Sequence, residues 1–353
     1  MRVHYSHDTS AELARLLVDA AGKPRYDRIF LFADETTASC CLPRLQPYED
    51  WCFGKPEVLT MPCGDVAKNL DTLVRVWEWL GQRGASRHSV LVNVGGGVVT
   101  DLGGFAAASF KRGIDFINVP TTLLAMVDAA VGGKTGINFG GLKNEIGAFR
   151  PASAVLIDTK FLSTLDDANL RSGYAEMLKH ALLSDVDMWA EHLQFDLMQP
   201  DLKRLADLVR RSIETKERIV AQDPTEKGLR KALNLGHTFG HAFESFALRG
   251  DHPVLHGYAV AWGLVCELYL SAVKLHFPTD RLHQTLRFIR EIYGRPSIDC
   301  KDYEALLELL RHDKKNAGGV INFTLLADVG QVQLDCHASR EEIFEAFDFL
   351  REG

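Results

Sequence analysis

The fold is decided by the segment Ser89-Val90-Leu91-Val92-Asn93-Val94-Gly95-Gly96-Gly97-Val98-Val99-Thr100-Asp101. An apolar run of strand length is followed by three glycines and then by the start of a helical pattern. This order predicts an anion site for a cofactor pyrophosphate, because backbone N–H groups at a helix start bind anions. The segment departs from the dinucleotide fingerprint G-x-G-x-x-G, since its last position is Thr100. A tight turn that binds no ligand is the alternative interpretation.

Continuous apolar runs recur through the first half of the chain. Such runs are typical of strands that are buried on both faces, as in a parallel sheet. They cover residues 28–33, 57–61, 89–94, 116–119 and 154–157. Helical patterns at 67–82 and 102–110 lie between them. This alternation predicts an α/β fold with a Rossmann-like, open parallel sheet in the N-terminal part.

The pattern changes after about Leu162 to long amphipathic stretches, which predict a mainly α-helical C-terminal part. We therefore expect two domains, residues 1–162 and 163–353, with Asp166 and Asp167 capping the first helix of the second. The expected helices are 168–183, 201–221, 229–247, 257–275, 279–293 and 303–312, followed by a strand at 319–326.

The composition excludes several classes of function. The chain has 353 residues and a formal net charge of −7, which argues against nucleic-acid and membrane-surface partners, since both are anionic. Its seven cysteines are odd in number and show no C-x-x-C spacing, which indicates reduced thiols and a cytoplasmic protein. The N-terminus has no apolar signal region, and no apolar run reaches membrane-spanning length.

Residues Val127 to Lys134 and Leu142 to Asn144 form the stretch that is richest in chemistry. It combines Asp128, a Gly-Gly turn, two lysines and an asparagine between apolar segments. Lysine suits an anion as a compact point charge, and glycines let backbone N–H groups approach it. The stretch predicts a pocket for a small anionic substrate.

A second set of polar residues follows helical spacing. Arg230, Asn234, His237 and His241 are four, three and four residues apart and would lie on one stripe of a helix. This stripe predicts a chemical face. Two structural histidines at a helix contact are the alternative, and the glutamate of the metalloprotease motif is missing because Thr238 follows His237.

Glu176, His237 and His256 together offer a carboxylate and two imidazoles, which is the ligand set of a catalytic zinc site. Glu176 and Lys179 share a helix face, but a surface ion pair is the more frequent explanation of such a pair. Asp34, at the end of an early strand, is a candidate for cofactor ribose hydroxyls or for a helix N-cap.

Three cationic segments are most simply solvated charges when each is taken alone. They are Lys111-Arg112-Gly113, Lys216 and residues 312–316.

Several segments nevertheless form an ordered set that covers most of the chain, from roughly residue 28 to residue 330. They are residues 95–102, 112–113, 119–128, 132–135, 143–144, 175–176, 233–237, 240–241, 255–257 and 313–315. This set resembles the 3-dehydroquinate synthase family of the sugar phosphate cyclases. The resemblance implies a dehydroquinate synthase-like fold with an NAD-binding α/β domain, a helical domain, an active site between them, and a homodimer.

The resemblance also implies roles for individual residues. A zinc ion, with cobalt as a possible substitute, would be held by Glu176, His237 and His256. NAD would contact Asp34, Cys63, Gly64, Asp65, Lys68, Gly97, Val98, Val99, Thr100, Asp101, Thr121, Thr122, Lys134, Lys143, Phe161, Leu162, Ser163 and Thr164. The sugar phosphate substrate would contact Arg112, Asp128, Lys134, Asn144, Lys179, Lys216, Arg230, Asn234, His241 and Lys314. Proton transfer would fall to Glu226 and His241, and catalysis would also use Lys134, Lys179, Arg230 and Asn234.

The implied reaction converts 3-deoxy-D-arabino-heptulosonate 7-phosphate to 3-dehydroquinate and phosphate. It proceeds by transient oxidation with NAD, phosphate elimination, re-reduction, ring opening and intramolecular aldol closure. Cyclases of other sugar phosphates, metal-dependent polyol dehydrogenases of the glycerol dehydrogenase type, and a non-catalytic sugar-phosphate-binding protein are the alternatives. Joint retention of Asp128, Lys134, Asn144 and Arg230 favours the carboxylate-bearing substrate. Thr100, where many relatives have glycine, and the pair Ala129-Ala130 depart mildly from the family pattern.

Overall fold

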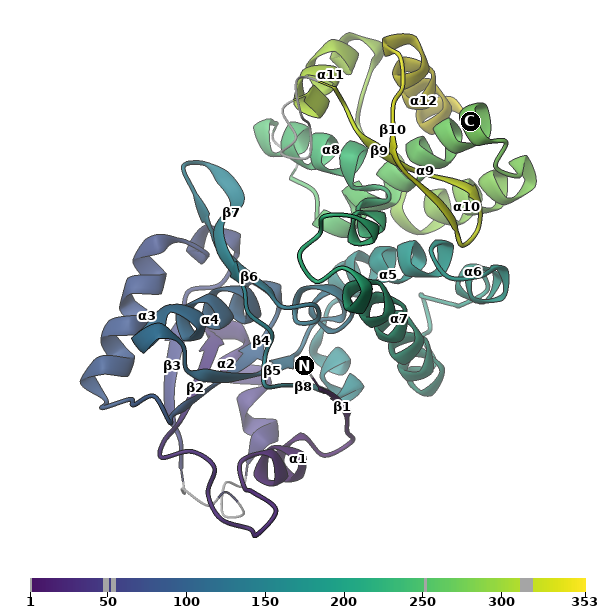
Figure 1. The fold of residues 1–353 in the computed structure, drawn as a ribbon. Coiled ribbons are helices and arrows are strands. Elements are labelled where there is room, and N and C mark those ends of the chain that lie inside the picture. The colour runs from purple at the N-terminus through teal and green to yellow at the C-terminus, as the bar shows by residue number, and fades with distance from the viewer. Residues whose placement is uncertain (1, 47–50, 52–54, 251–252, 312–319) are drawn as a thin grey trace. The chain divides into compact units, whose positions relative to one another are not determined.

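The computed structural model describes residues 2–46, 51, 55–250, 253–311 and 320–353. The chain forms two compact units, Met1–Asp166 and Asp167–Gly353 (Figure 1). The sequence pattern placed the change slightly earlier, before Ser163. The unit boundary instead coincides with the start of a long helix at Asp167.

The first unit is built on a six-stranded sheet in which every pair is parallel. Its spatial order is β1-β8-β5-β4-β2-β3 (Figure 1). The strands are β1 (Val3–Tyr5), β2 (Ile29–Asp34), β3 (Glu57–Met61), β4 (Val90–Gly95), β5 (Asp115–Pro120) and β8 (Ala154–Ile157). The predicted α/β fold class with an open parallel sheet is confirmed. The strand order reverses between β2 and β4, and ligands of open α/β sheets bind at such a switch point.

The helices of this unit connect the strands. They are α1 (Thr9–Leu16), α2 (Glu35–Cys40), α3 (Leu70–Gln82) and α4 (Gly97–Ser109), with short helices η1 (Leu42–Leu45), η2 (Asp65–Ala67), η3 (Phe110–Arg112), η4 (Ala125–Ala129) and η5 (Thr159–Thr164). The helix expected over 102–110 begins earlier, at Gly97, because Val99 and Thr100 are buried against the sheet and extend its first turn.

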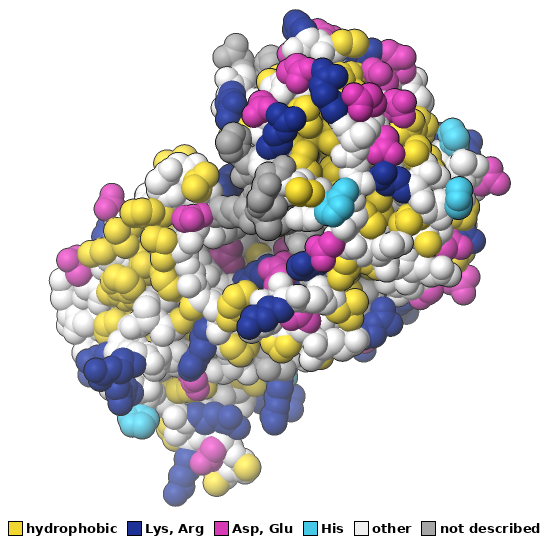
Figure 2. Space-filling model, turned by 45° about the horizontal axis from the view of Figure 1, so that its top comes forward, with side chains coloured by type: hydrophobic (Ala, Val, Ile, Leu, Met, Phe, Trp, Pro, Cys, Tyr) yellow, Lys and Arg dark blue, Asp and Glu magenta, His cyan; other side chains and the backbone are white. Residues whose placement is uncertain are grey.

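The stretch that the sequence marks as an anion pocket begins in η4 and continues into a β-hairpin, which the sequence pattern did not predict. Strands β6 (Lys134–Phe139) and β7 (Leu142–Phe149) pair antiparallel. The turn between them is made by Gly140 and Gly141, whose φ angles of 59° and 80° suit a type I′ turn. The hairpin leaves Phe139, Leu142 and Phe149 about half exposed. Figure 2 shows that hydrophobic side chains, in yellow, occupy part of the surface in this view.

The second unit is mainly helical, as predicted. Its elements are α5 (Asp167–Leu182), α6 (Val186–Leu193), α7 (Leu202–Gln222), η6 (Leu229–Asn234), α8 (His237–Arg249), α9 (His256–Leu275), α10 (Thr279–Tyr293), η7 (Cys300–Asp302), α11 (Tyr303–Arg311), β9 (Phe323–Asp328), β10 (Gln331–Cys336) and α12 (Arg340–Glu352). Helix α9 is central, because α5, α8, α10, α12 and β9 all pack on it.

Helix α9 is also long and apolar enough to cross a membrane by length and composition alone. This finding differs from the expectation that no apolar run reaches membrane-spanning length. Because 67% of its apolar window is buried inside the unit, α9 has the environment of a core helix.

The single helix expected over 229–247 is wrong. The chain forms η6, breaks at Gly236, and restarts as α8 at His237. Gly236 has φ of 79°, and a side chain there would lie 2.8 Å from Leu264 and 3.0 Å from the carbonyl of Val260. Only glycine fits this left-handed, tightly packed position. Arg230 and Asn234 therefore do not share a helical stripe with His237 and His241.

His192, buried in α6, should make the stability of the protein pH-dependent. Burial lowers its pKa to about 4, from an ordinary value of 6.5, although its Nδ1 contacts the carbonyl of Met188 at 2.8 Å. The folded pKa is depressed, so the stabilisation is complete above about pH 6.5 and is lost as the pH falls towards 4. At about 1.4 kcal/mol per pKa unit, the loss reaches roughly 3 kcal/mol.

Urea unfolding between pH 7 and pH 4 would measure this loss. We expect His192→Leu to show a flatter pH profile than the wild type, whereas His283→Leu, at an exposed position of α10, should keep the wild-type slope. Identical slopes in all three proteins would contradict the prediction.

Candidate active site

In the first unit, the glycine turn Gly95–Gly97 connects β4 to α4 and exposes its backbone at the switch point of the sheet. A Cβ atom on Gly95 would lie 2.6 Å from Val99, and one on Gly96 or Gly97 would lie 3.1 Å from Thr122 or Ala129. The three glycines therefore allow a packing that side chains would obstruct. Gly96 caps α4 without a side-chain hydrogen bond, so no capping side chain of the N-cap residue occupies the first N–H groups of this helix.

The departure at Thr100 does not enlarge this turn. Thr100 is buried, and its hydroxyl lies 3.3 Å from the carbonyl of Gly96 and 3.2 Å from that of Gly97. The extra side chain thus satisfies carbonyls of its own helix.

Lys68 links two segments of the predicted NAD set to a predicted substrate residue. Its side chain is buried, and its Nζ donates to Asp101 Oδ2 at 2.6 Å and to Asn144 Oδ1 at 2.5 Å. Asn144 has φ of 52° and was assigned to the substrate by the resemblance. Lys143 Nζ lies 3.8 Å from Asp65 Oδ2. The hairpin therefore brings Lys143 and Asn144 to the segment that contains Cys63 to Lys68.

Asp34 and Cys63 lie at the carboxyl ends of the neighbouring strands β2 and β3. Asp34 caps α2 by accepting from the N–H of Thr37 at 2.7 Å, so the N-cap interpretation is confirmed. Cys63 Sγ lies 3.7 Å from Asp34 Oδ1 and 3.0 Å from Thr36 Oγ1. The cap uses one oxygen of Asp34 and leaves the role towards a ribose a prediction.

Other residues of the predicted NAD set are held from neighbouring loops. The N–H of Thr121 donates to the carbonyl of Gly95 at 3.0 Å, and Thr122 Oγ1 accepts from the N–H of Ala125 at 3.1 Å. In η5, Phe161 and Leu162 are buried, whereas the hydroxyls of Ser163 and Thr164 bond carbonyls of their own helix.

The predicted substrate residues of the first unit do not all gather. Asp128 is half-buried in η4, and Lys134 is exposed at the start of β6. Arg112 precedes β5 and, with Ser86, Arg87 and Lys111, lines a surface pocket. Residues 86–89 precede β4 and residues 111–114 precede β5, so this pocket lies at the amino-terminal ends of these parallel strands. The glycine turn lies at the carboxyl end of β4, on the opposite side of the sheet along the strand direction.

In the second unit, three helices bring Glu176, His237 and His256 together. The Nε2 atoms of His237 and His256 lie 3.3 Å and 3.4 Å from Glu176 Oε1, and the three ligand atoms lie within 4.8 Å of one another. Within the described residues, Glu176 Oε1 is buried without a hydrogen-bond partner. The Nδ1 atoms face away, towards Leu235 O for His237 and Glu244 Oε2 for His256.

Lys179 keeps Glu176 anionic. Both side chains are almost fully buried and form an ion pair, so the surface-pair alternative is wrong. Burial alone would raise the pKa of Glu176, but the charges of Lys179 and His237 hold that pKa well below its ordinary value. The cluster thus presents a carboxylate and two imidazoles, which is a suitable donor set for a divalent metal.

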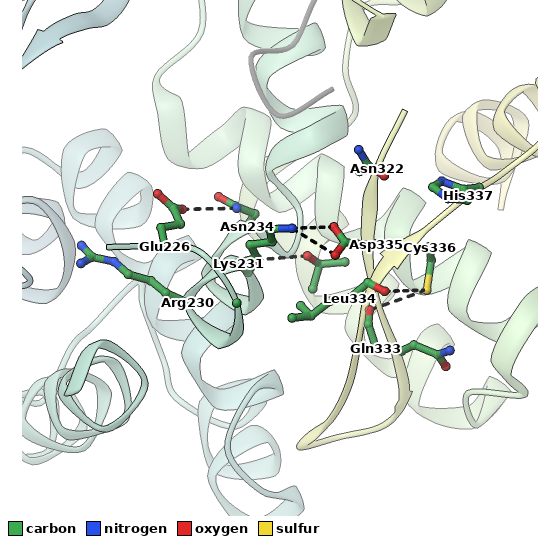
Figure 3. Close-up of polar contacts among 12 residues, drawn as sticks. Glu226, Arg230, Lys231, Asn234, Asn322, Gln333, Leu334, Asp335, Cys336 and His337 are labelled. Atoms are coloured by element: carbon green, nitrogen blue, oxygen red, sulfur yellow. Dashed lines mark hydrogen bonds and ion pairs between the residues drawn. The ribbon is translucent and has the colours of Figure 1, made fainter. Parts of the chain in front are cut away.

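The segment before α8 carries three more of the predicted catalytic residues, Glu226, Arg230 and Asn234 (Figure 3). Asn234 Nδ2 donates to Glu226 Oε1 at 3.4 Å, and Arg230, almost fully buried, donates to Pro224 O at 2.7 Å. Lys231 points the other way and contacts both carboxylate oxygens of Asp335 at 3.0 Å. Glu226 has φ of 62°, and such strained backbone at non-glycine residues is typical of functional sites.

The remaining predicted residues have varied positions. His241 follows His237 by one turn of α8, with ring centroids 5.5 Å apart, and its ring lies 6.2 Å from that of His256. Lys216 is buried in α7, so it is not a solvated charge. Lys314 lies outside the described residues.

Sequence reasoning missed three carboxylates that support these residues. Asp223 accepts N–H groups of Lys227, Gly228 and Arg230, at 3.0, 2.7 and 3.1 Å. Glu244 contacts His256, and Glu267 is fully buried beside the start of α8. Helical spacing could have predicted Glu244, because it follows His237 by seven residues, or two turns, on the same helix. No pattern in the sequence indicates Glu267.

Comparison with known proteins identifies the family of the chain. The family model of the 3-dehydroquinate synthase N-terminal region matches residues 58–172, and that of the C-terminal region matches residues 173–316. The chain belongs to the 3-dehydroquinate synthase family. A 3-dehydroquinate synthase of Parabacteroides distasonis is 50% identical over 342 residues, which are 97% of this chain and 96% of that protein.

Solved structures of other cyclases have the same fold as this member of the 3-dehydroquinate synthase family. ValA, a 2-epi-5-epi-valiolone synthase of Streptomyces hygroscopicus with NAD+ and Zn2+ bound, is 27% identical with a TM-score of 0.84 and covers 99% of this chain and 96% of its own. A 2-deoxy-scyllo-inosose synthase complexed with carbaglucose-6-phosphate, NAD+ and Co2+ is 24% identical with a TM-score of 0.84, over 98% and 95%. The latter likeness shows the fold alone.

The reaction is that of the 3-dehydroquinate synthase family. The chain is a phosphate-eliminating cyclase, a carbon–oxygen lyase, that converts 3-deoxy-D-arabino-heptulosonate 7-phosphate to 3-dehydroquinate in the shikimate pathway. The family models and the 50% identity favour this activity over another cyclase or a polyol dehydrogenase.

Proposed function

We propose that the 3-dehydroquinate synthase reaction of this chain uses a divalent metal held by Glu176, His237 and His256. The observation that carries the proposal is the approach of two imidazole Nε2 atoms to one oxygen of a buried, anionic carboxylate, at 3.3 Å and 3.4 Å. Zn2+ suits this donor set, and Co2+ accepts the same ligands. A bound metal supplies Lewis acidity, which lowers the pKa of a coordinated substrate hydroxyl.

The same proposal assigns NAD to the switch point of the first unit. Three features support this assignment: the helix start at Gly97, the buried Lys68, and Asp34, which caps α2. Pyrophosphates bind at such helix starts, and acidic residues contact the ribose. NAD supplies a hydride acceptor that is regenerated within each cycle. Lys68, held by Asp101 and Asn144, would position its charge for the cofactor phosphates.

Residues of the second unit would manage protons and charge. His241, one helical turn after His237, would accept a proton from the substrate hydroxyl, and Glu226 would act with it, oriented by Asn234. Arg230 and Lys216 would neutralise the anionic groups of the substrate, since both are cations held in buried positions. Lys179 would keep Glu176 in its charged form.

We further propose that the enzyme acts on its small-molecule sugar phosphate without a nucleic-acid or membrane partner, and that it is a homodimer in the cytoplasm. The exposed Phe139, Leu142 and Phe149 on the β6–β7 hairpin support a second copy as partner, because exposed apolar clusters are typical of interfaces. Sedimentation of the full chain would measure the oligomeric state, and a monomer at micromolar concentration would exclude the dimer.

One assay tests the proposed use of the cofactors. With the heptulosonate phosphate, Zn2+ and substoichiometric NAD, we expect phosphate release in proportion to substrate, without net NADH, because the hydride returns within each turnover. Phosphate and NADH absorbance are followed together. Steady accumulation of NADH without phosphate release would contradict the reaction, whereas full turnover after removal of NAD would contradict the cofactor.

A further inference from the structure

Glu267 is a fully buried carboxylate that the proposed chemistry does not use. It lies on α9, and its two oxygens accept hydrogen bonds from two N–H groups at the start of α8. Oε2 accepts from Gly236 at 2.7 Å and Oε1 from Thr238 at 3.1 Å. The two donors flank His237 in sequence. Glu267 therefore fixes the backbone on both sides of a predicted metal ligand, where the helix dipole also favours a negative charge.

The packing of the two helices leaves this carboxylate little freedom. A Cβ atom on Gly263 of α9 would lie 2.0 Å from the carbonyl oxygen of Gly236, and one on Gly240 of α8 would lie 3.1 Å from Val260 Cα. The backbones are thus in direct contact over one turn before Glu267. This contact fixes the position of α8 along the axis of α9. The hydrogen bonds of Glu267 fix the backbone around His237 and therefore the direction of its side chain.

Helix α8 makes a similar contribution to α9. Glu244 of α8 is buried, and its Oε2 lies 3.3 Å from Nδ1 of His256, the first residue of α9. A carboxylate on Nδ1 fixes the orientation of the imidazole ring, so that Nε2 faces Glu176. Each helix therefore carries one predicted metal ligand and one carboxylate that orients the ligand of the other helix.

We propose that Glu244 and Glu267 are positioning residues that preset the geometry of His256 and His237 before the metal binds. The proposal rests on the proposed metal role of the three ligands. The pair acts by orientation, because Glu267 contacts backbone N–H groups and Glu244 contacts the imidazole nitrogen that faces away from the metal position. Carboxylates in such outer positions typically contribute about 10- to 100-fold to metal affinity.

The test measures Co2+ and Zn2+ affinity of the metal-free full chain, by Co2+ absorption and by competition of Zn2+ with a chelator. Glu267→Gln keeps the volume but replaces one acceptor by a donor, so we expect affinity to fall about 10-fold or more. Glu244→Leu should weaken binding about 10- to 100-fold, and Glu244→Gln should recover part of the loss, because its amide oxygen still accepts from Nδ1. The Co2+ spectrum should change in both losing variants.

Two controls separate positioning from general loss of stability. Thr285→Val removes a buried hydrogen bond from Trp189 in the same unit, at 3.0 Å, and should keep wild-type metal affinity at a comparable loss in melting temperature. His237→Ala tests the site itself. Wild-type affinity in Glu267→Gln and Glu244→Leu, with binding lost in His237→Ala, would overturn the positioning role alone. Retained binding in His237→Ala would overturn the proposed metal site, and the positioning role with it.

Discussion

His237→Ala should abolish high-affinity binding of Zn2+ and Co2+ and lower turnover by roughly a thousandfold or more. Lewis-acid stabilisation is worth several kcal/mol, and each factor of ten in rate corresponds to about 1.4 kcal/mol. Glu176 and His256 would remain, but two protein ligands seldom hold a catalytic metal. The measurements are metal content after dialysis and phosphate release from the heptulosonate phosphate.

The fold should survive this substitution. Alanine is a good helix former, and the hydrogen bonds of Glu267 to Gly236 and Thr238 involve the backbone of α8 rather than the imidazole of His237. His283→Ala, on the exposed face of α10, is the matched control and should keep metal content and turnover. Full activity of metal-free His237→Ala protein would refute the metal assignment.

Gly263→Ala should strongly destabilise the second unit. The new Cβ would lie 2.0 Å from Gly236 O and 2.7 Å from Gly240 N, and these are backbone atoms that cannot rotate away. Overpacking of a core costs about 1–3 kcal/mol and occasionally more. We expect the upper end of this range, together with weaker metal binding, because α8 must move away from α9.

Gly81→Ala provides the control for the Gly263 substitution. Gly81 lies in α3, and a Cβ atom there would meet no atom within 4 Å. Removing a helical glycine in open space should stabilise α3 by about 0.5–1 kcal/mol. Thermal unfolding and Co2+ affinity of both variants test the pair, and a Gly263→Ala protein with wild-type stability and affinity would contradict the packing argument.

The inner strands of the sheet could be predicted from the sequence because they are buried on both faces. The run at 154–157 coincides with β8, and the run at 89–94 nearly coincides with β4, since an uninterrupted apolar segment has few other uses in an α/β chain. The run at 57–61 coincides with β3, although this edge strand is mostly exposed. The β6–β7 hairpin could not be predicted in this way. Its strands carry polar residues on exposed faces, and the signal of Gly140-Gly141 as a type I′ turn was masked by the apparent anion motif.

The site was only partly accessible to local patterns. Helical spacing grouped His237 with Arg230 and Asn234, but a glycine inside an amphipathic pattern does not reveal a left-handed break, and Gly236 separates them. No periodicity connects Glu176 with His256, because they come together only when α5 and α8 pack on α9. The resemblance supplied that ligand set, and physical spacing alone left it weak.

The break at Gly236 has a consequence for how selectivity and metal binding can vary. Residues 223–234 form a segment that is separate from α8. Asp223 accepts hydrogen bonds from N–H groups within the segment, and Lys231 contacts Asp335 near its other end. The predicted ligand histidines lie on α8 and α9. A substitution in this segment therefore changes the surroundings of Glu226, Arg230 and Asn234, and we expect it to alter the choice of sugar phosphate more than the affinity for the metal.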